Sequence, residues 1–271
     1  MLSHNQLPFV MVSGLSKEIE MKKINSRAQS GSVLIVVLVM LVLLTLVGTW
    51  AIRGSINSLK ISTNAQAQAL LKQASDSVFY TLENKTDNQL TLAQMRGGDG
   101  MLGYVMRPEN KGKEMVFCIR GSVTDNFSGG RIASVVYWQG STIKNTDAGK
   151  NGFCQKSRLT DFLSGRNAVM TQVSIRSAEN ERDWEDMLEG DDKDTSKSIG
   201  KPRVAITVTS IIPNFSEAST TEINTCLSNF TSFSDTVTKN ETVTDCLAGK
   251  NVPYSTQQME YILQTLSGSS S

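Results

Sequence analysis

An uncharged apolar stretch near the N-terminus constrains this chain more than any other feature. Residues 33–52 are twenty consecutive residues without a charge, and fourteen of them are Val, Leu or Ile. A stretch of this length spans a bilayer as one α-helix. At roughly −0.3 to −0.6 kcal/mol for each such residue, the fourteen side chains favour insertion by about 4 to 8 kcal/mol. The sequence therefore predicts a single transmembrane helix.

Basic residues set the predicted orientation of this helix. Four Lys or Arg residues precede the apolar stretch and only two follow it closely, namely Lys17, Lys22, Lys23 and Arg27 before it and Arg53 and Lys60 after it. An excess of Lys and Arg marks the cytoplasmic side. We therefore expect an inner-membrane protein with its N-terminus in the cytoplasm and everything after residue 52 in the periplasm. A secretory signal peptide would have a shorter apolar core, about 7 to 15 residues, and a small-residue cleavage site after it. Neither feature is evident in this sequence.

The helical pattern continues beyond the apolar stretch. Between Arg53 and Lys85 there is no Pro, and Gly occurs only at Gly54. Polar residues separate apolar ones at helical spacing, so we expect one rod over residues 32–85, on the order of 80 Å long at about 1.5 Å per residue. A bend is expected near Gly48 and Gly54, because Gly weakens a helix by about 1 kcal/mol relative to Ala. The stripe expected to pack on a folded domain consists of Leu70, Leu71, Ala74, Val78 and Leu82.

Together these features resemble the N-terminus of type IV pilins and type II secretion pseudopilins. A basic leader ends at Gly31, Ser32 follows, and the apolar helix begins at once. In that family a prepilin peptidase cuts after the glycine, so the resemblance implies a mature chain that starts at Ser32. The segment SGSVLIVVLVMLVLLTLVGTWAIRGS, with AQALLKQASDSVFY after it, is most similar to the PilX-type minor pilins. By this resemblance, the side chains that pack on other pilin helices include Val33, Leu34, Val36, Leu38, Leu41 and Leu44.

The fifth position after Gly31 departs from the family pattern. Most members carry Glu there, whereas this chain has Val36. In the family the carboxylate is understood to pair with the N-terminal ammonium of a neighbouring subunit, since an unpaired charge in hydrocarbon costs about 2.5 to 3.5 kcal/mol or more. Pilin-like proteins without this Glu resemble subunits at the filament tip. The K-type pseudopilin of type II secretion also lacks it, so that assignment stays open.

A single exported domain is expected after the helix, since enough residues remain there for one core. Four runs are rich in β-branched or aromatic residues and bounded by Gly, Asn, Ser or Pro, as strands are: 115–120, 132–138, 168–176 and 204–212. The predicted class is α+β. With the resemblance it becomes a type IV pilin-like fold, a long N-terminal helix packed on an antiparallel sheet. The predicted parts are the leader 1–31, the transmembrane half 32–52, the amphipathic half 53–85 and the periplasmic domain 86–271.

All four cysteines lie beyond the membrane stretch, where a periplasm permits disulfides. Four cysteines allow three pairings, and the sequence does not choose among them. Pairing sequence neighbours closes the shortest loops and is the pairing we favour, Cys118 with Cys154 and Cys226 with Cys246. A zinc site is disfavoured because there is no CxxC spacing and the one histidine, His4, precedes the predicted cut.

Other segments carry weaker signals. The run ERDWEDMLEGDDKD at 181–194 offers oxygen ligands for calcium at Asp191, Asp192 and Asp194, and K-type pseudopilins bind calcium by family resemblance, but the run lacks EF-hand spacing. A solvated loop or a docking surface is the interpretation that we favour. Residues 224–245 are expected to form a polar surface loop. Residues 252–266 are expected to form a short helix, followed by a disordered tail at 267–271.

Nothing in the sequence indicates catalysis or nucleic-acid binding. The exported part has no histidine, GxSxG or phosphate-cradling GKS or GKT motif, and the formal charge of the whole chain is +1. We expect no enzyme activity, cofactor or metal. The resemblance implies a minor pilin of a tip or priming complex, with other minor pilins, a tip adhesin, prepilin peptidase and membrane lipids as partners. Adhesion and twitching motility are functions of such pili (fimbriae). A tip pseudopilin and a simple membrane-anchored periplasmic domain stay open as alternatives.

Overall fold

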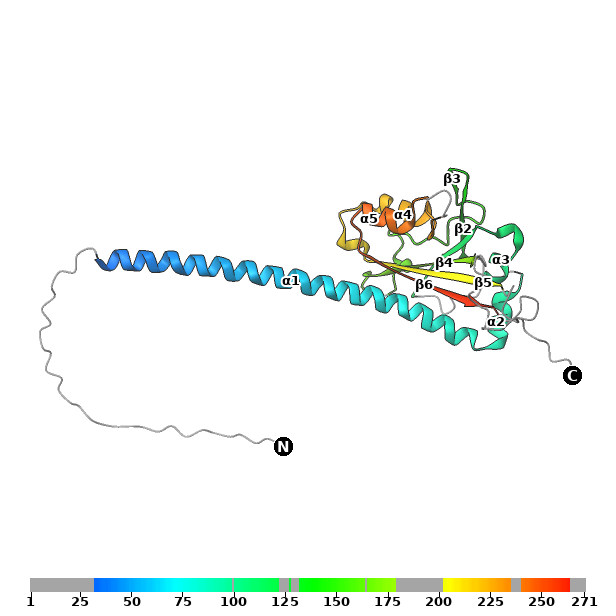
Figure 1. Cartoon of the computed structure of the whole chain (residues 1–271), viewed down its shortest axis with the longest axis horizontal. Coiled ribbons are helices and arrows are strands. Elements are labelled where there is room, and N and C mark those ends of the chain that lie inside the picture. Colours follow the sequence, from blue (N-terminus) through cyan, green and yellow to red (C-terminus); the bar gives the residue numbers. More distant parts are fainter. Residues whose placement is uncertain are drawn as a thin grey trace, which may run out of the picture. The chain divides into compact units, whose positions relative to one another are not determined.

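A computed structural model describes residues 32–98, 100–121, 127, 132–163, 165–178, 202–234 and 240–263. The chain divides into two units, Met1–Ser58 and Leu59–Ser271. The described part of the first unit is entirely helical. The second unit combines helices with one antiparallel sheet (Figure 1). The predicted α+β fold, with a long N-terminal helix packed on an antiparallel sheet, is confirmed.

The first element, α1, runs from Ser32 to Thr86 as one α-helix of 55 residues. It starts at the predicted first mature residue and ends one residue beyond the predicted limit. Helical structure is unbroken at Gly48 and Gly54, where an added Cβ would meet nothing within 4 Å. The bend expected at these glycines is therefore not accompanied by an interruption of the helix, and the bend itself stays a prediction.

The sheet has six strands in the order β3-β2-β1-β4-β5-β6, with every neighbouring pair antiparallel. Its strands are β1 (Glu114–Cys118), β2 (Ser134–Gln139), β3 (Thr142–Lys144), β4 (Met170–Ala178), β5 (Arg203–Ile211) and β6 (Tyr254–Ile262). The four predicted strands correspond to β1, β2, β4 and β5, with ends shifted by one to two residues. β4 and β5 pair over nine residues each, and they form the buried centre of the sheet.

The last strand corrects the sequence-based prediction of a short helix at 252–266. Residues 254–262 instead pair residue by residue with the whole of β5, from Tyr254 opposite Ile211 to Ile262 opposite Arg203. Most side chains of β6 are exposed. Its sequence therefore lacks the alternation of apolar and polar residues by which a half-buried strand is recognised. The extended form is decided by pairing with a strand that lies about fifty residues earlier in the chain.

The domain half of α1 packs on one face of the sheet. Leu71, Val78, Phe79 and Leu82 are 0% to 3% exposed. Three hydroxyl groups fix the contact, because the Ser210 Oγ lies 2.9 Å from both the Ser75 Oγ and the Thr171 Oγ1. Buried polar groups that are hydrogen-bonded in this way avoid the penalty of lost hydration. Of the predicted stripe, only Leu70 is wrong, because it is 42% exposed.

Two short helices, α2 (Gln89–Arg96) and α3 (Met101–Val105), follow α1 and close the same core. The side chain of Asn88 caps α2 by accepting hydrogen bonds from the backbone N–H groups of Leu90 and Thr91. Figure 1 shows α2 and α3 at one end of the sheet, and α4 and α5 at the other. The buried residues that these helices add to the core are Met95, Met101, Leu102 and Val105.

Two further helices cover the two ends of the polar loop predicted at 224–245, and the described residues between them, 229–234 and 240–242, are not helical. α4 (Thr220–Ser228) and α5 (Val243–Gly249) each begin with a capping box, formed by Ser219 with Glu222 and by Thr242 with Asp245. Both boxes are visible in the sequence as a hydroxyl residue followed three positions later by an acid. They satisfy the first free N–H groups of each helix, and the two helices bury Ile223, Cys226, Leu227, Val243 and Leu247.

The domain contains two disulfide bonds, one between Cys118 and Cys154 and one between Cys226 and Cys246. This is the pairing of sequence neighbours favoured above. The first bridge ties β1 to the segment after β3, and the second ties α4 to α5. Both belong to one cluster of buried residues, together with Phe162, Met170 and Ile211. The bridges therefore reinforce the part of the core at the α4 and α5 end.

A buried carboxylate holds the loop after α4 against the sheet. Glu114, the first residue of β1, is 0% exposed. Its Oε2 accepts a hydrogen bond from the Ser232 backbone N–H at 2.8 Å, and its Oε1 is hydrogen-bonded to the Ser232 hydroxyl. Burial raises the pKa of Glu114 to about 7, although the Ser232 hydrogen bonds and the charge of Arg176 act in the opposite direction.

Candidate functional site: an apolar helix without a protein partner

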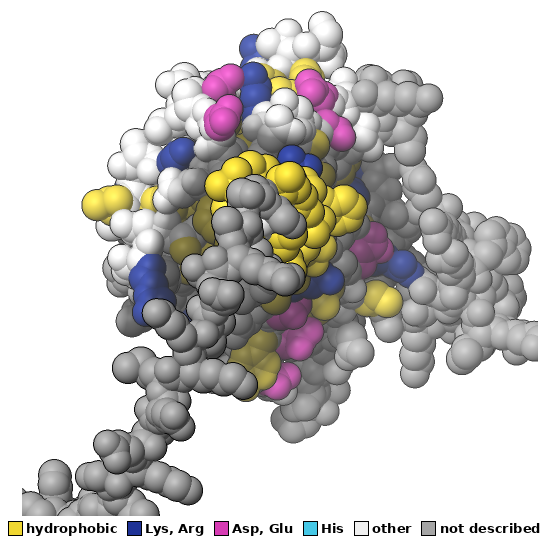
Figure 2. Space-filling view, turned by 90° about the vertical axis from the view of Figure 1, so that its left-hand side faces the viewer, with side chains coloured by type: hydrophobic (Ala, Val, Ile, Leu, Met, Phe, Trp, Pro, Cys, Tyr) yellow, Lys and Arg dark blue, Asp and Glu magenta, His cyan; other side chains and the backbone are white. Residues whose placement is uncertain are grey.

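The predicted assembly helix exposes its apolar side chains on all sides. The six residues named from the sequence are each between 54% and 72% exposed: Val33, Leu34, Val36, Leu38, Leu41 and Leu44. Figure 2 shows hydrophobic side chains gathered at the N-terminal end of α1. A helix that is apolar all round is stable only when lipid or other helices surround it. The site is therefore a surface for a non-aqueous environment.

By length and composition, α1 is the one helix among the described residues that can cross a membrane. Its most apolar window has none of its area buried within the protein. That result separates it from the core helix of a soluble protein, which would be covered by its own domain. The observation fits a membrane anchor and agrees with the transmembrane prediction for 32–52.

The polar groups within this apolar segment are satisfied locally. The hydroxyl of Thr45 donates to the carbonyl oxygen of Val42, and that of Thr49 donates to Leu46, both at 2.8 Å. Such hydrogen bonds within the helix leave neither threonine hydroxyl without a partner in hydrocarbon. These two residues are therefore compatible with surrounding lipid tails or apolar helices.

No carboxylate interrupts the first part of the helix. Between Ser32 and Ser75 the sequence contains no Asp or Glu, and Asp76 is the first acid of α1. Val36, at the position where most pilin-like chains carry Glu, is a 57% exposed apolar side chain. This helix can contact a neighbour through apolar packing, but it cannot offer a negative charge within the membrane segment.

The other predicted site residues are distributed as follows. Ser32 is the first residue of α1, whereas Gly31 and the rest of the leader lie outside the described residues. The possible calcium ligands at 181–194 and the tail at 267–271 also lie outside them. Within the part of the chain that the structure describes, no group of three or more His, Cys, Asp or Glu side chains is placed to hold a metal ion.

Comparison with known families gives one match. Residues 30–79 match the family PilX N-terminal. This match supports a PilX-type type IV pilin. The PilX-type segment includes the apolar helix and most of the α1 face that packs on the sheet. Searches of curated proteins and of solved structures give no match. The matched family is structural, and its members work with other pilus components.

Sequence reasoning missed a set of exposed apolar residues just beyond the membrane-length stretch of the PilX-type segment. Leu59 and Ile61 are 68% and 70% exposed, and Leu70 is 42% exposed. A usable signal was present, since Leu59, Thr63, Gln66 and Leu70 recur at steps of four, three and four residues. That spacing places them along one side of a helix.

Proposed function

We propose that this chain is a minor pilin that takes part in type IV pilus assembly within a tip or priming complex. It is anchored in the inner membrane by residues 32–52 with its domain in the periplasm, is trimmed after Gly31, and then enters the pilus. Its work is binding between subunits and not catalysis. The partners expected are other minor pilins, a tip adhesin and prepilin peptidase.

One observation carries this proposal, namely that a PilX-type segment coincides with an uncovered apolar helix that begins at Ser32. A simple membrane anchor needs the apolar residues but does not need the helix to continue as a packing face of the folded domain. The position at the tip is supported by Val36, because a subunit without a carboxylate there does not need a partner ammonium from the next subunit.

The test is the mass of the N-terminal peptide of the full chain, isolated from membranes of cells with and without prepilin peptidase. We expect a peptide that begins at Ser32 in the first case and an intact leader in the second. Gly31→Leu serves as the uncleaved control. Sheared pili should contain the processed chain. An intact leader in both strains, with none of the chain in pili, would leave the simple anchor as the better assignment.

The type II secretion tip pseudopilin is the second candidate, since Val36 is compatible with it as well. Isolation of the processed chain distinguishes the two. A pilus protein is recovered with sheared pili and is lost when the major pilin is deleted, whereas a secretion pseudopilin is recovered with the secretion machinery and its deletion blocks the release of secreted enzymes.

A further inference from the structure

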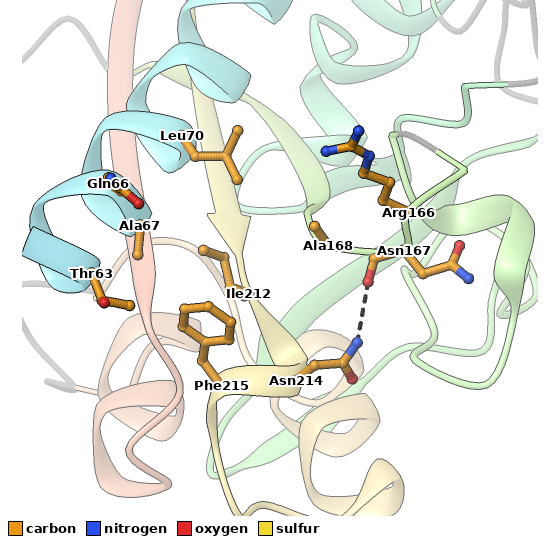
Figure 3. Close-up of a pocket in the computed structure, with 10 residues that line it drawn as sticks. All are labelled: Thr63, Gln66, Ala67, Leu70, Arg166, Asn167, Ala168, Ile212, Asn214 and Phe215. Atoms are coloured by element: carbon orange, nitrogen blue, oxygen red, sulfur yellow. Dashed lines mark hydrogen bonds between the residues drawn. The ribbon is translucent and has the colours of Figure 1, made fainter. Parts of the chain in front are cut away.

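A pocket of about 330 Å³ lies beside α1 within the second unit. One wall is the α1 face that carries Thr63, Gln66 and Leu70, and the facing wall is the turn before β4 that carries Arg166 (Figure 3). Ile212 and Phe215, from the segment after β5, complete the lining. Three segments that are distant in sequence thus form one concave surface.

The wall opposite α1 is held in place by hydrogen bonds. The Asn214 Nδ2 donates to the carbonyl oxygen of Asn167 at 3.1 Å (Figure 3), and Asn167 adopts a left-handed conformation with φ of 50°. The Ile212 backbone N–H donates to the carbonyl oxygen of Pro253 at 3.0 Å. The pocket is therefore formed before any partner arrives, which lowers the entropic cost of binding.

The pocket exposes large apolar side chains to solvent. Phe215 is 58% exposed and Leu70 is 42% exposed, whereas Ile212 between them is buried. Concave sites lined by apolar side chains with a few placed polar groups are typical binding sites. The space between Leu70 and Phe215 suits an aliphatic or aromatic side chain of a partner.

The charge in the pocket lining has one sign. Arg166 is the only charged residue of the lining, and no acidic side chain lines the pocket. The Lys156 Nζ donates to the carbonyl oxygen of Pro213, next to Asn214 in the chain, at 3.1 Å. Lys60 precedes Thr63 by three residues and so lies on the same side of α1. A partner that carries carboxylates is favoured by this arrangement.

A row of exposed residues along one side of α1 favours a helix as the partner. Leu59, Thr63, Gln66 and Leu70 recur at steps of four, three and four residues and form a seam with a leucine at each end and two polar residues between them. The seam leads directly into the pocket, because three of its four residues line the pocket. A helix laid along this seam would place one large side chain beside Leu70.

We propose that this pocket is the docking site for a helix of a neighbouring pilin-like subunit, which inserts a large apolar side chain between Leu70 and Phe215 and places a carboxylate beside Arg166. The proposal rests on the proposed function and adds to it which surface of the domain is used and what chemistry the partner presents. The contact lies outside the membrane segment and depends on side chains of the folded domain.

The test uses site-specific photo-crosslinking of the full chain in its own bacterium. The photoreactive residue p-benzoylphenylalanine replaces Phe215. The cells are illuminated to form covalent adducts, which are then identified by mass spectrometry. We expect an adduct to a pilin-like subunit, at a helical segment with Asp or Glu within one turn of the crosslinked residue. The adduct should require prepilin peptidase, since an unprocessed chain would not be assembled.

Charge variants then test the recognition itself. Arg166→Glu should lower the adduct yield about tenfold, because a like charge replaces an attractive one. Lys150→Glu makes the same change at an exposed position that does not line the pocket, and should leave the yield unchanged. Intact disulfides and an unchanged melting temperature would establish that both variants are folded.

Several outcomes would overturn the proposal. They are an adduct only to lipid or to a periplasmic protein that is not pilin-like, an equal yield in both charge variants, or no adduct from a chain that is processed and present in pili. In each of these cases the pilin function stands. A chain that keeps its leader and is missing from pili overturns the proposed function and this inference together.

Discussion

In the proposed function, the side chain of Val36 determines where in a filament the subunit can lie. The stretch around it contains no acid, so the helix makes no ionic contact in the membrane segment. A subunit that depends only on apolar packing there is held in place by dispersion contacts, which are similar for many neighbours and do not fix a partner.

Replacing this residue should change the position of the subunit. We expect Val36→Glu to move the chain from filament tips to positions along the shaft, because the new carboxylate can pair with the N-terminal ammonium of a neighbour. Immunogold electron microscopy of sheared pili would measure the distribution. Val37→Glu places the same charge about 100° round the helix and should only lower the amount of inserted chain. Identical label patterns for both variants would contradict this assignment.

Glu114 makes the stability of the domain depend on pH. Its pKa is about 7 in the folded protein and close to the ordinary value of 4.5 in the unfolded chain, so the folded state binds the proton more tightly. The contribution is fully present below about pH 4.5 and is lost as pH rises through 7. A shift of this size corresponds to about 3 kcal/mol.

The prediction is made relative to Glu114→Gln, which cannot titrate. Between pH 4.5 and pH 8, the unfolding free energy of the natural chain should fall by about 3 kcal/mol relative to that of the variant. Urea unfolding of both full-length proteins in detergent would measure it. Glu222 and Asp245 have lowered pKa values with the opposite pH dependence, but they are present in both proteins and cancel. Parallel pH profiles would refute the prediction.

At the scale of elements, the second disulfide substitutes for a large core under α4 and α5. These helices have nine and seven residues, too few to be stable alone. The bridge between Cys226 and Cys246 closes a loop of 20 residues. Replacing both by Ser should lower the unfolding free energy by about 3 kcal/mol. Chemical denaturation with intrinsic fluorescence would measure this, and a loss below about 1 kcal/mol would mean that packing alone holds the helices.

The α1 face offers a matched pair of adjacent leucines. Leu71 is 0% exposed and Leu70 is 42% exposed. Leu71→Ala should lower the unfolding free energy by about 2 to 5 kcal/mol, since it leaves a cavity in a closed core. Leu70→Ala should cost under about 1 kcal/mol and act on subunit association instead. Thermal unfolding followed by circular dichroism would separate them, and equal losses would argue against the assignment of Leu70 to a binding surface.

Local signals explain which elements could be predicted from the sequence. The uninterrupted helix and the four β-branched runs are encoded within short windows, and the structure places α1, β1, β2, β4 and β5 there. β6 could not be recognised, because its exposed side chains follow no period of two and only β5 makes it extended. α4 and α5 are a different case, since both capping boxes are present in the sequence and outweigh a polar composition.

The candidate site was predictable only in part for the same reason. Apolar composition alone indicates the membrane segment from residue 33 onward. The pocket, in contrast, joins residues near positions 66, 167 and 213, and no window of the sequence contains all three. Leu70 and Leu71 are adjacent and lie about 100° apart around α1. Helical spacing alone does not show which of the two faces the core.

At the scale of the whole molecule, the chain uses two kinds of environment. The residues after Ser32 carry apolar side chains that need lipid or other helices, whereas the second unit has its own core, two disulfides and a closed set of buried hydroxyl contacts. The folded domain therefore does not depend on assembly for its stability. In the proposed function, association in a filament then uses exposed surfaces, namely the apolar side chains of α1 and the pocket that α1 forms with the domain.

The pairing of β6 with β5 has a consequence for the timing of biogenesis. The ribosome makes α1 first, β5 later and residues 254–262 after both, yet β5 is buried along nearly its whole length and gains its second neighbour only from those residues. The sheet therefore cannot be completed until residues 254–262 have been made and have reached β5. With the proposed membrane topology, a chain that is stalled or shortened before Tyr254 would remain tethered to the bilayer with an uncovered central strand, and would be a substrate for chaperones and proteases.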